Sequence, residues 1–429
     1  MESILQAARG RRKGRRMGEP WVVSREEVEG LELNARAEII RALIPLGLIG
    51  ACEMLQAELE ELTGARHARK ARGLRRHGTN RGSVRLAGQW VPVRVPRVRG
   101  EGGEVPLRSY RALRERDGAV DERLLRGVLY GLSCRNYERA ALAVPGALGL
   151  GKSSVSRAFV EASAARLKAF QERGLSGEDF VVLFLDGKSF AEDGMVIALG
   201  VTLEGRKRLL GFVQSDTESS QVLAPFLRGL LERGLDVSRG ILVVIDGGKG
   251  LRKAVDLAFN RGAKRALVQR CQWHKRENVV RPLPKGEQRA WRGRLTRAWE
   301  RPTYGEARSA LLRLHGELEE RNLSAAGSLE EGFEETLTLH RLGVFALLGR
   351  SLKTTNCIES VLSGVEERCA KVDHWTNSRQ KHRWLAASLL DIEPRLRRIK
   401  GYRHLPKLRE ALQRELGIEK EHAASEEAA

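Results

Sequence analysis

Two acidic residues directly follow short, strongly apolar runs of the sequence. Asp186 comes after residues 181–185, Asp246 comes after residues 241–245, and a glycine follows each acid. Continuous apolar runs of this length are typical of strands buried on both faces of a sheet. A rigid sheet can hold carboxylates that share divalent cations, and paired Mg²⁺ ions catalyse displacement at phosphorus. The alternative is that both Asp-Gly pairs merely begin turns, where this dipeptide is common.

The segments around these acids predict the elements that must position them. Residues 195–203 and 207–214 have the pattern of two further strands, joined by a Glu-Gly turn. A helix over 219–233, a helix over 251–260 and a strand over 266–270 complete the series. Three linked strands followed by helix, strand, helix and strand are the order of an RNase H-like sheet. The sequence therefore predicts an α/β core in which each acid ends a buried strand.

Positive charge dominates the chain and is concentrated before this core. The 429 residues carry 76 Lys and Arg against 55 Asp and Glu, a formal net charge of +21, which indicates a polyanionic partner and first of all nucleic acid. Residues 66–99 form a basic run without any acid. Such a run favours contact with double-stranded DNA, because its positive charges repel one another unless phosphates neutralise them. A solvated basic arm is the alternative. Residues 83–98 within this run alternate apolar and polar positions and predict a β-hairpin. The basic residues of the run are Arg66, Arg69, Lys70, Arg72, Arg75, Arg76, Arg81, Arg85, Arg94, Arg97 and Arg99.

Residues 121–173 are predicted to be helical and to include a helix-turn-helix. Ser133 starts one helix, and Pro145 ends it. The next helix opens with small polar residues and would present Ser154 and Arg157 to a DNA groove. Plain helical connectors are the alternative reading of this segment.

The turn between these two helices also fits the phosphate-loop pattern. Residues 146–153 match GxxxxGKS at every position. A phosphate loop needs a preceding buried strand, whereas residues 137–144 have the pattern of a helix. An ATPase that depends on Lys152 is therefore an alternative that we do not favour.

Several motifs resemble those of the mutator-type transposases of bacterial insertion sequences. The Cys-x-x-His and Thr-Thr-Asn-x-Ile-Glu elements, in this order, are specific to that family. The resemblance implies a DDE transposase with an RNase H-like core, in which Asp186, Asp246 and Glu359 bind two Mg²⁺ (or Mn²⁺) ions. The matching segments, between about residues 75 and 405, are GLSCR at 131–135, DGKSF at 186–190, VVIDG at 243–247, QRCQWH at 269–274, TTNCIE at 354–359 and RW at 383–384.

The same resemblance gives His274 a role in contacting the scissile phosphate or assisting proton transfer. The alternative is a hydrogen-bonded structural histidine. Cys271 and His274 could instead join Cys369 and His374 in a zinc site, but the two pairs are far apart in the sequence and we do not favour it. Three tryptophans are interpreted as core residues rather than base-stacking platforms: Trp273, Trp375 and Trp384.

The long gap between Asp246 and Glu359 contains mostly helical patterns and resembles the helical insertion of the family. Glu359 would lie on a helix that returns to the sheet, with Thr354 or Thr355 capping its start. The predicted regions are a basic DNA-binding region (1–115), a helical, helix-turn-helix-like region (116–178), the first part of the core (179–278), the insertion (279–347), the last core helices (348–416) and an acidic tail (417–429).

The composition excludes other classes of protein. Charged residues interrupt every apolar stretch well before the roughly 18 residues that a membrane span needs. Five scattered cysteines and the lack of a secretory signal fit a reduced bacterial cytoplasm, at the nucleoid.

The function predicted is Mg²⁺-dependent strand cleavage at the ends of a mobile element, followed by transfer of the freed 3′-OH into target DNA. A homodimer or larger assembly on double-stranded DNA is expected, because two ends must be joined together. A DNA-binding protein with an inactive core is a further alternative.

Overall fold

A computed structural model of the chain describes residues 33–65, 73–86, 89–115, 125–126, 128–130, 152–215, 219–370 and 372–418. Contacts divide the chain into two units, residues 1–121 with 134–155 and residues 122–133 with 156–429. The first helix of the predicted helix-turn-helix, most of the predicted phosphate loop and most of the acidic tail lie outside the described residues.

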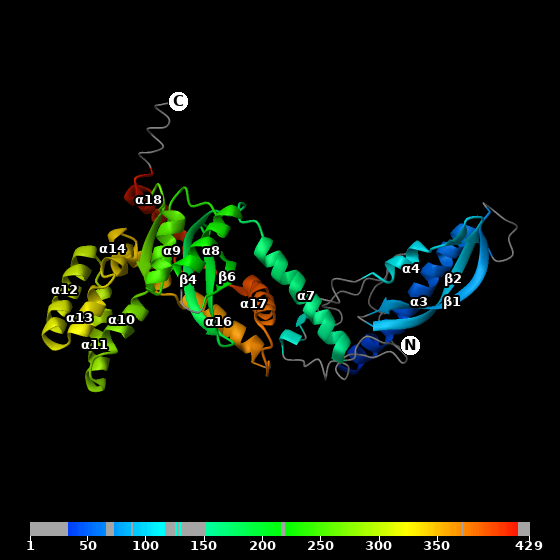
Figure 1. Cartoon of the computed structure of the whole chain (residues 1–429), viewed down its shortest axis with the longest axis horizontal. Coiled ribbons are helices and arrows are strands. Elements are labelled where there is room, and N and C mark those ends of the chain that lie inside the picture. Colours follow the sequence, from blue (N-terminus) through cyan, green and yellow to red (C-terminus); the bar gives the residue numbers. More distant parts are fainter. Residues whose placement is uncertain are drawn as a thin grey trace, which may run out of the picture. The chain divides into compact units, whose positions relative to one another are not determined.

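The first unit combines one long helix with a β-hairpin (Figure 1). Its elements are α3 (Leu33–Thr63), β1 (Arg75–Leu86), β2 (Gln89–Gly100), β3 (Gly103–Val105) and α4 (Arg108–Ala112). Strands β1 and β2 pair antiparallel from Arg75 opposite Arg99 to Leu86 opposite Gln89, which confirms the predicted hairpin. A proline inside a helix is expected to split or kink it, but α3 runs without interruption through Pro45.

A small apolar core holds this helix against the hairpin. Leu55 and Leu59 lie one helical turn apart on α3, and they pack with Val95 and Val98 of β2.

Among the described residues, no helix, α3 included, is both long and apolar enough to cross a membrane.

In the second unit, helix α7 (Lys152–Glu172) precedes a five-stranded sheet. The helix predicted from residue 153 is therefore confirmed, and it starts one residue earlier. Ser154 is half-buried and Arg157 is exposed on its first turns. Phe159 packs against Trp384, with ring centroids 4.9 Å apart.

The sheet has the order β6-β5-β4-β7-β8. Strand β5 pairs antiparallel with both β4 and β6. Strand β7 pairs parallel with both β4 and β8. All five strands were predicted from the sequence, and so were the two helices between them. The bounds are β4 (Phe180–Phe190), β5 (Asp193–Thr202), β6 (Lys207–Gln214), α8 (Ser220–Glu232), β7 (Ile241–Ile245), α9 (Lys249–Phe259) and β8 (Ala266–Arg270).

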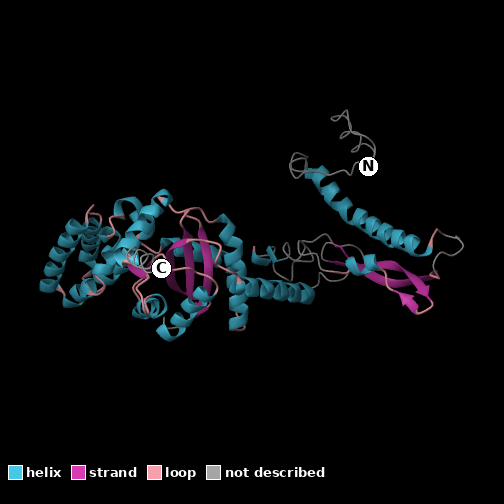
Figure 2. Cartoon of the chain, turned by 90° about the horizontal axis from the view of Figure 1, so that it is seen from above, coloured by secondary structure: helices cyan, strands magenta, loops and turns pink. Residues whose placement is uncertain are grey.

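Helices cover the sheet (Figure 2). Leu183 and Leu185 of β4 share one core with residues of α8 and α9. Because side chains alternate along a strand, Phe184 and Asp186 point to the opposite face. Helix α16 (Asn356–Cys369) contacts β4 and carries Glu359 in its first turn. The fold therefore separates a purely apolar face from a face that holds acidic residues.

The segment between β8 and α16 is helical and has its own apolar core. That core includes Trp291, Leu295, Trp299, Leu311 and Leu337. The predicted mostly helical character of residues 279–347 is confirmed. The elements are α10 (Gln272–Val280), α11 (Lys285–Trp299), α12 (Tyr304–Arg321), α13 (Leu323–Glu330), η1 (Glu334–Leu337), α14 (Thr338–Arg341) and α15 (Phe345–Leu352).

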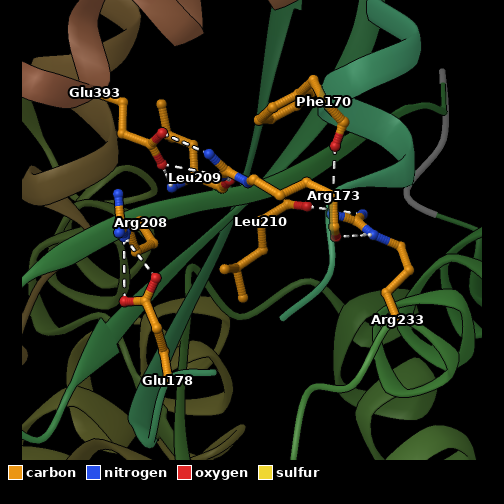
Figure 3. Close-up of polar contacts among 8 residues, drawn as sticks. All are labelled: Phe170, Arg173, Glu178, Arg208, Leu209, Leu210, Arg233 and Glu393. Carbon is orange, nitrogen blue, oxygen red and sulfur yellow. Dashed lines mark hydrogen bonds and ion pairs between the residues drawn. The ribbon is translucent and has the colours of Figure 1, made fainter. Parts of the chain in front are cut away.

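The last elements return to the sheet and cover its edge. They are α17 (Ser378–Ile392), η2 (Glu393–Arg395), η3 (Tyr402–His404) and α18 (Leu405–Leu416). Strand β6 is an edge strand, and Figure 3 shows side chains bonded to its backbone. Glu393 accepts a hydrogen bond from the Leu209 N–H at 2.7 Å and pairs with Arg173 at 2.6 Å. Arg233 donates to the carbonyl of Leu210 at 2.9 Å. These contacts occupy groups that could otherwise pair with another strand.

Candidate active site

Strands β4 and β7 bring the two predicted aspartates to equivalent positions. Leu185 lies opposite Ile245 in the parallel pairing of these strands, and Asp186 and Asp246 are the next residues. Asp246 follows the end of β7, as predicted. Asp186, by contrast, lies inside β4, which continues to Phe190 in its pairing with β5, so the predicted strand end at Asp186 is wrong.

Asp186 is almost completely buried, with 5% of its surface exposed. Burial is the main reason why its pKa is raised to about 7, and the negative charge of Asp246 raises it further. Glu359 adds to this effect, whereas the nearby His274 and a hydrogen bond from Thr355 lower the pKa. The three predicted acids therefore interact electrostatically at one place in the fold.

Glu359 reaches this place from the first turn of α16, where the helix dipole favours a negative charge. Thr355 occupies the N-cap position of this helix, as predicted, but its side chain makes no capping hydrogen bond. Its fully buried hydroxyl instead donates to the sulfur of Cys271 at 3.8 Å and lowers the pKa of the nearby Asp186. Thr355 is thus a positioning residue that we missed, although it lies inside the Thr-Thr-Asn-x-Ile-Glu motif.

His274 lies in the first turn of α10, directly after β8. The side chain of Cys271 contributes most to raising its pKa to about 9, and the carboxylates of Asp186 and Asp246 add to that rise. Among the described residues, the buried Nδ1 atom of His274 has no hydrogen-bond partner. The raised pKa favours the protonated imidazole at neutral pH.

The loop that carries Asp246 is held by contacts that the sequence analysis did not anticipate. The carboxylate of Asp246 accepts a hydrogen bond from the Gly248 N–H at 2.9 Å. Gly247 has φ +114°, and a Cβ at this position would overlap the guanidinium of Arg270. Arg270 is itself buried and donates to the carbonyl of Glu331 at 2.9 Å.

Replacing Gly247 by Ala is expected to displace Asp246. The strained backbone would cost about 1–3 kcal/mol of stability, and a shift of the carboxylate of roughly 1 Å would slow the DNA cleavage predicted from the sequence about a hundredfold. Urea unfolding and a cleavage assay measure the two effects. Gly286→Ala is the matched control, because its Cβ would meet nothing within 4 Å on α11, and it should leave cleavage unchanged. Equal activity of the two variants would contradict this account.

A second buried cation joins the helical segment to the site. Lys275 is 0% exposed, and its ammonium donates to the carbonyls of Ser328 and Glu331 at 2.5 Å each. These carbonyls lie at the end of α13, where a positive charge complements the helix dipole. Arg270 binds the same end, so α13 is anchored directly behind the Asp246 loop.

No three His, Cys, Asp or Glu side chains gather closely enough to hold a metal on their own within the described part of the chain. Cys369 lies beside Ser388, with 3.9 Å between sulfur and hydroxyl oxygen, and nothing described here supports the zinc alternative. The carboxylates of Asp186 and Asp246 offer hard oxygen donors, which suit Mg²⁺ when water and substrate oxygens complete its coordination shell.

The predicted DNA-contacting basic residues differ in their exposure and in their partners. Arg97 pairs with Glu104 at 2.9 Å, and Arg76 donates to the carbonyl of Gly64 at 2.7 Å, so both have partners within the protein. Arg85 is half-buried near the ring of Trp90. Those with exposed side chains are Arg75, Arg81, Arg94 and Arg99. Those outside the described residues are Arg66, Arg69, Lys70 and Arg72.

The exposed arginines form two pairs across the strands. Arg75 lies opposite Arg99, and Arg81 lies opposite Arg94. Like charges directly opposite each other destabilise a hairpin unless an anion compensates them. Arg94 and Arg99 adjoin the buried Val95 and Val98, so they point away from the face that packs on α3.

Fold and site define a mixed α/β protein that holds two aspartates at equivalent positions of adjacent parallel strands. Within this class the chain belongs to the Mutator family of transposases, whose family model matches residues 26–397. It is 27% identical over 358 residues to the transposase for insertion sequence element IS256 in transposon Tn4001 of Staphylococcus aureus, covering 79% of this chain and 85% of the relative. It is also 27% identical to the transposase for insertion sequence element ISRM5 of Rhizobium meliloti, covering 83% of this chain and 89% of the relative.

Proposed function

We propose that this chain is a DDE transposase, which cleaves DNA strands at the ends of its own mobile element and transfers the 3′-OH ends into target DNA. The observation that carries the proposal is the pairing of β4 with β7, which puts Asp186 and Asp246 side by side near Glu359. Membership of the Mutator transposase family supports it.

An RNase H-like core is part of this proposal. Across the sheet, the order of the strands is β6-β5-β4-β7-β8, so the first strand of the core in the chain, β4, lies in the middle. Strands β7 and β8 are parallel to β4. This arrangement is the one expected for that core, with the helical segment inserted before the helix that carries the glutamate. We propose the corresponding regions as 179–278, 279–347 and 348–416.

The charge of the site suits divalent cations. Burial and Asp246 raise the pKa of Asp186, which shows that the carboxylates interact unfavourably without a compensating charge. Asp186, Asp246 and Glu359 would hold the ions, and two Mg²⁺ ions would supply activation of the attacking oxygen and stabilisation of the leaving oxygen. Thr355 lowers the pKa of Asp186 and so favours its charged form, and a protonated His274 would donate a hydrogen bond to a phosphate oxygen.

The exposed arginine pairs of the hairpin are proposed to bind the phosphates of the element ends. Changing Arg81 and Arg94 to Gln is expected to weaken DNA binding and to reduce the slope of log K against log salt by about 0.9 for each lost phosphate contact. Binding titrations at several salt concentrations measure this slope.

The matched control removes Arg97 together with its partner Glu104 by changing both to Gln. This double change leaves the net charge unaltered, so the slope should stay near that of the unmodified protein. A slope that is unchanged in the Arg81 and Arg94 variant would show that the hairpin does not contact phosphates.

The direct test is strand cleavage and strand transfer on a duplex carrying the element's own ends, with Mg²⁺ added. Cleavage that leaves a 3′-OH, followed by joining to a second duplex, is the expected result. DNA binding without cleavage would favour the inactive DNA-binding protein instead. Cleavage that depends on ATP and on Lys152 would favour the phosphate-loop ATPase.

A further inference from the structure

Trp273 is exposed at the rim of the candidate active site. Of its surface, 44% is accessible to solvent, whereas Trp384 and Trp299 are 8% and 2% exposed. Trp375 contacts the rings of Phe190 and Trp384, as expected of a core residue. The interpretation as a core residue is therefore confirmed for Trp384, Trp375 is only half-buried, and for Trp273 the interpretation is wrong.

The backbone around Trp273 is firmly anchored. The Cys271 N–H donates to the carbonyl of Ile245 at 2.7 Å, and the Gln272 N–H donates to the carbonyl of Lys353 at 2.9 Å. The buried amide of Gln272 also donates to the carbonyl of Thr336 at 2.9 Å. Because the backbone that carries the indole of Trp273 is already fixed, little conformational entropy of this segment would be lost when a ligand binds.

The indole of Trp273 is one contact away from the acids. Its ring meets the imidazole of His274 edge-to-face, with centroids 4.8 Å apart and an interplanar angle of 85°. His274 in turn interacts with the carboxylates of Asp186 and Asp246. A phosphate held at these acids would bring the base of the same or the adjoining nucleotide within reach of Trp273.

We propose that Trp273 stacks on a nucleobase of the element end that leaves the duplex next to the cut phosphodiester. This inference rests on the proposed function, because it assumes that a DNA end occupies the site. An indole offers no charge to a phosphate, and its exposed aromatic surface matches the π-face that every base presents. A base stacked inside the duplex cannot meet this ring, so the base must be unstacked, as in enzymes that flip a base. Trp273 is thereby a positioning residue that holds the strand with its phosphate at the acids.

The test compares cleavage of an intact end duplex with cleavage of the same duplex made abasic at each position near the cut. Trp273→Ala is expected to lower the rate about 10- to 100-fold on the intact duplex, from the loss of one stacking contact. Trp273→Phe keeps an aromatic face and should remain within about threefold of the unmodified rate. On the duplex that lacks the stacked base, Trp273→Ala should cause no further loss.

Leu323→Ala is the matched control, because Leu323 is 77% exposed on α13 and is not part of the proposed site. It should leave all rates unchanged, and all variants should unfold at the same temperature. Equal rates of Trp273→Ala and the unmodified protein would overturn the stacking role while leaving the transposase proposal intact. A change in oligomeric state with the same loss on every duplex would instead assign Trp273 to a protein contact. No cleavage by the unmodified protein would overturn the proposed function itself.

Discussion

Asp186→Asn is expected to abolish Mg²⁺-dependent strand cleavage while DNA binding is retained. The change keeps the shape of the side chain and removes the charge that a metal ion requires, so the loss should be on the order of a thousandfold or more. Asp246→Asn and Glu359→Gln should have effects of similar size, because the three carboxylates interact at one site. Binding should stay the same or become tighter, since each change removes a negative charge that faces the DNA phosphates.

Glu366→Gln is the matched control for Glu359→Gln. Glu366 lies two turns along the same helix, where it pairs with Lys188 at 2.6 Å and is 56% exposed. It should retain nearly full cleavage, because exposed ion pairs contribute little. Cleavage retained in Asp186→Asn, or lost equally in both glutamate variants, would contradict the assignment of the acids.

The strands of the five-stranded sheet could be predicted because their composition is typical of buried strands. Residues 241–245 and 181–185 are continuous apolar runs, and polar residues follow them. The continuation of β4 to Phe190 could not be predicted in this way. Its last residues pair with β5 through a turn at Ala191 and Glu192, which have positive φ values of 50° and 72°. Neither is the Gly or Asn that usually indicates such a turn.

Only part of the candidate site could be predicted from the sequence. Asp186 and Asp246 could be singled out because each follows an apolar run, whereas Glu359 followed only from the family motif. Its approach to the sheet depends on the packing of α16 after a long helical segment, which no local pattern shows. The exposure of Trp273 and the contact of Thr355 with Cys271 depend equally on the packing of distant segments.

The helix that carries Glu359 is held by a buried ion pair. Arg368 of α16 donates to Asp391 of α17 through Nε at 2.9 Å and through a second nitrogen at 2.8 Å. The hydroxyl of Tyr130 donates to the same carboxylate at 2.8 Å. The side chains of Asp391 and Arg368 are 3% and 7% exposed. Burial alone would raise the pKa of Asp391, but the hydrogen bonds from Arg368 and Tyr130 lower it below its usual value.

Asp391→Ala is expected to lower the free energy of unfolding by about 3–5 kcal/mol, because it leaves the guanidinium of Arg368 buried without its partner. Changing Asp391 to Leu and Arg368 to Met together should recover much of this loss, since an apolar pair of similar volume replaces both charges. Urea unfolding followed by circular dichroism measures these differences. A double variant that is less stable than Asp391→Ala would contradict the ion-pair account.

The pH dependence separates the charge of Asp391 from its packing. A carboxylate whose pKa is lowered by folding stabilises the protein above its ordinary pKa of 3.8, and this contribution is lost as the pH falls through the lower, folded value. Asp391→Asn should therefore be clearly less stable than the unmodified protein at pH 7, and the difference should shrink steadily below about pH 4. A difference that is the same at both pH values would mean that α16 is held by packing alone. Because Glu359 lies on that helix, strand cleavage by Asp391→Asn should also fail at a lower temperature than cleavage by the unmodified protein.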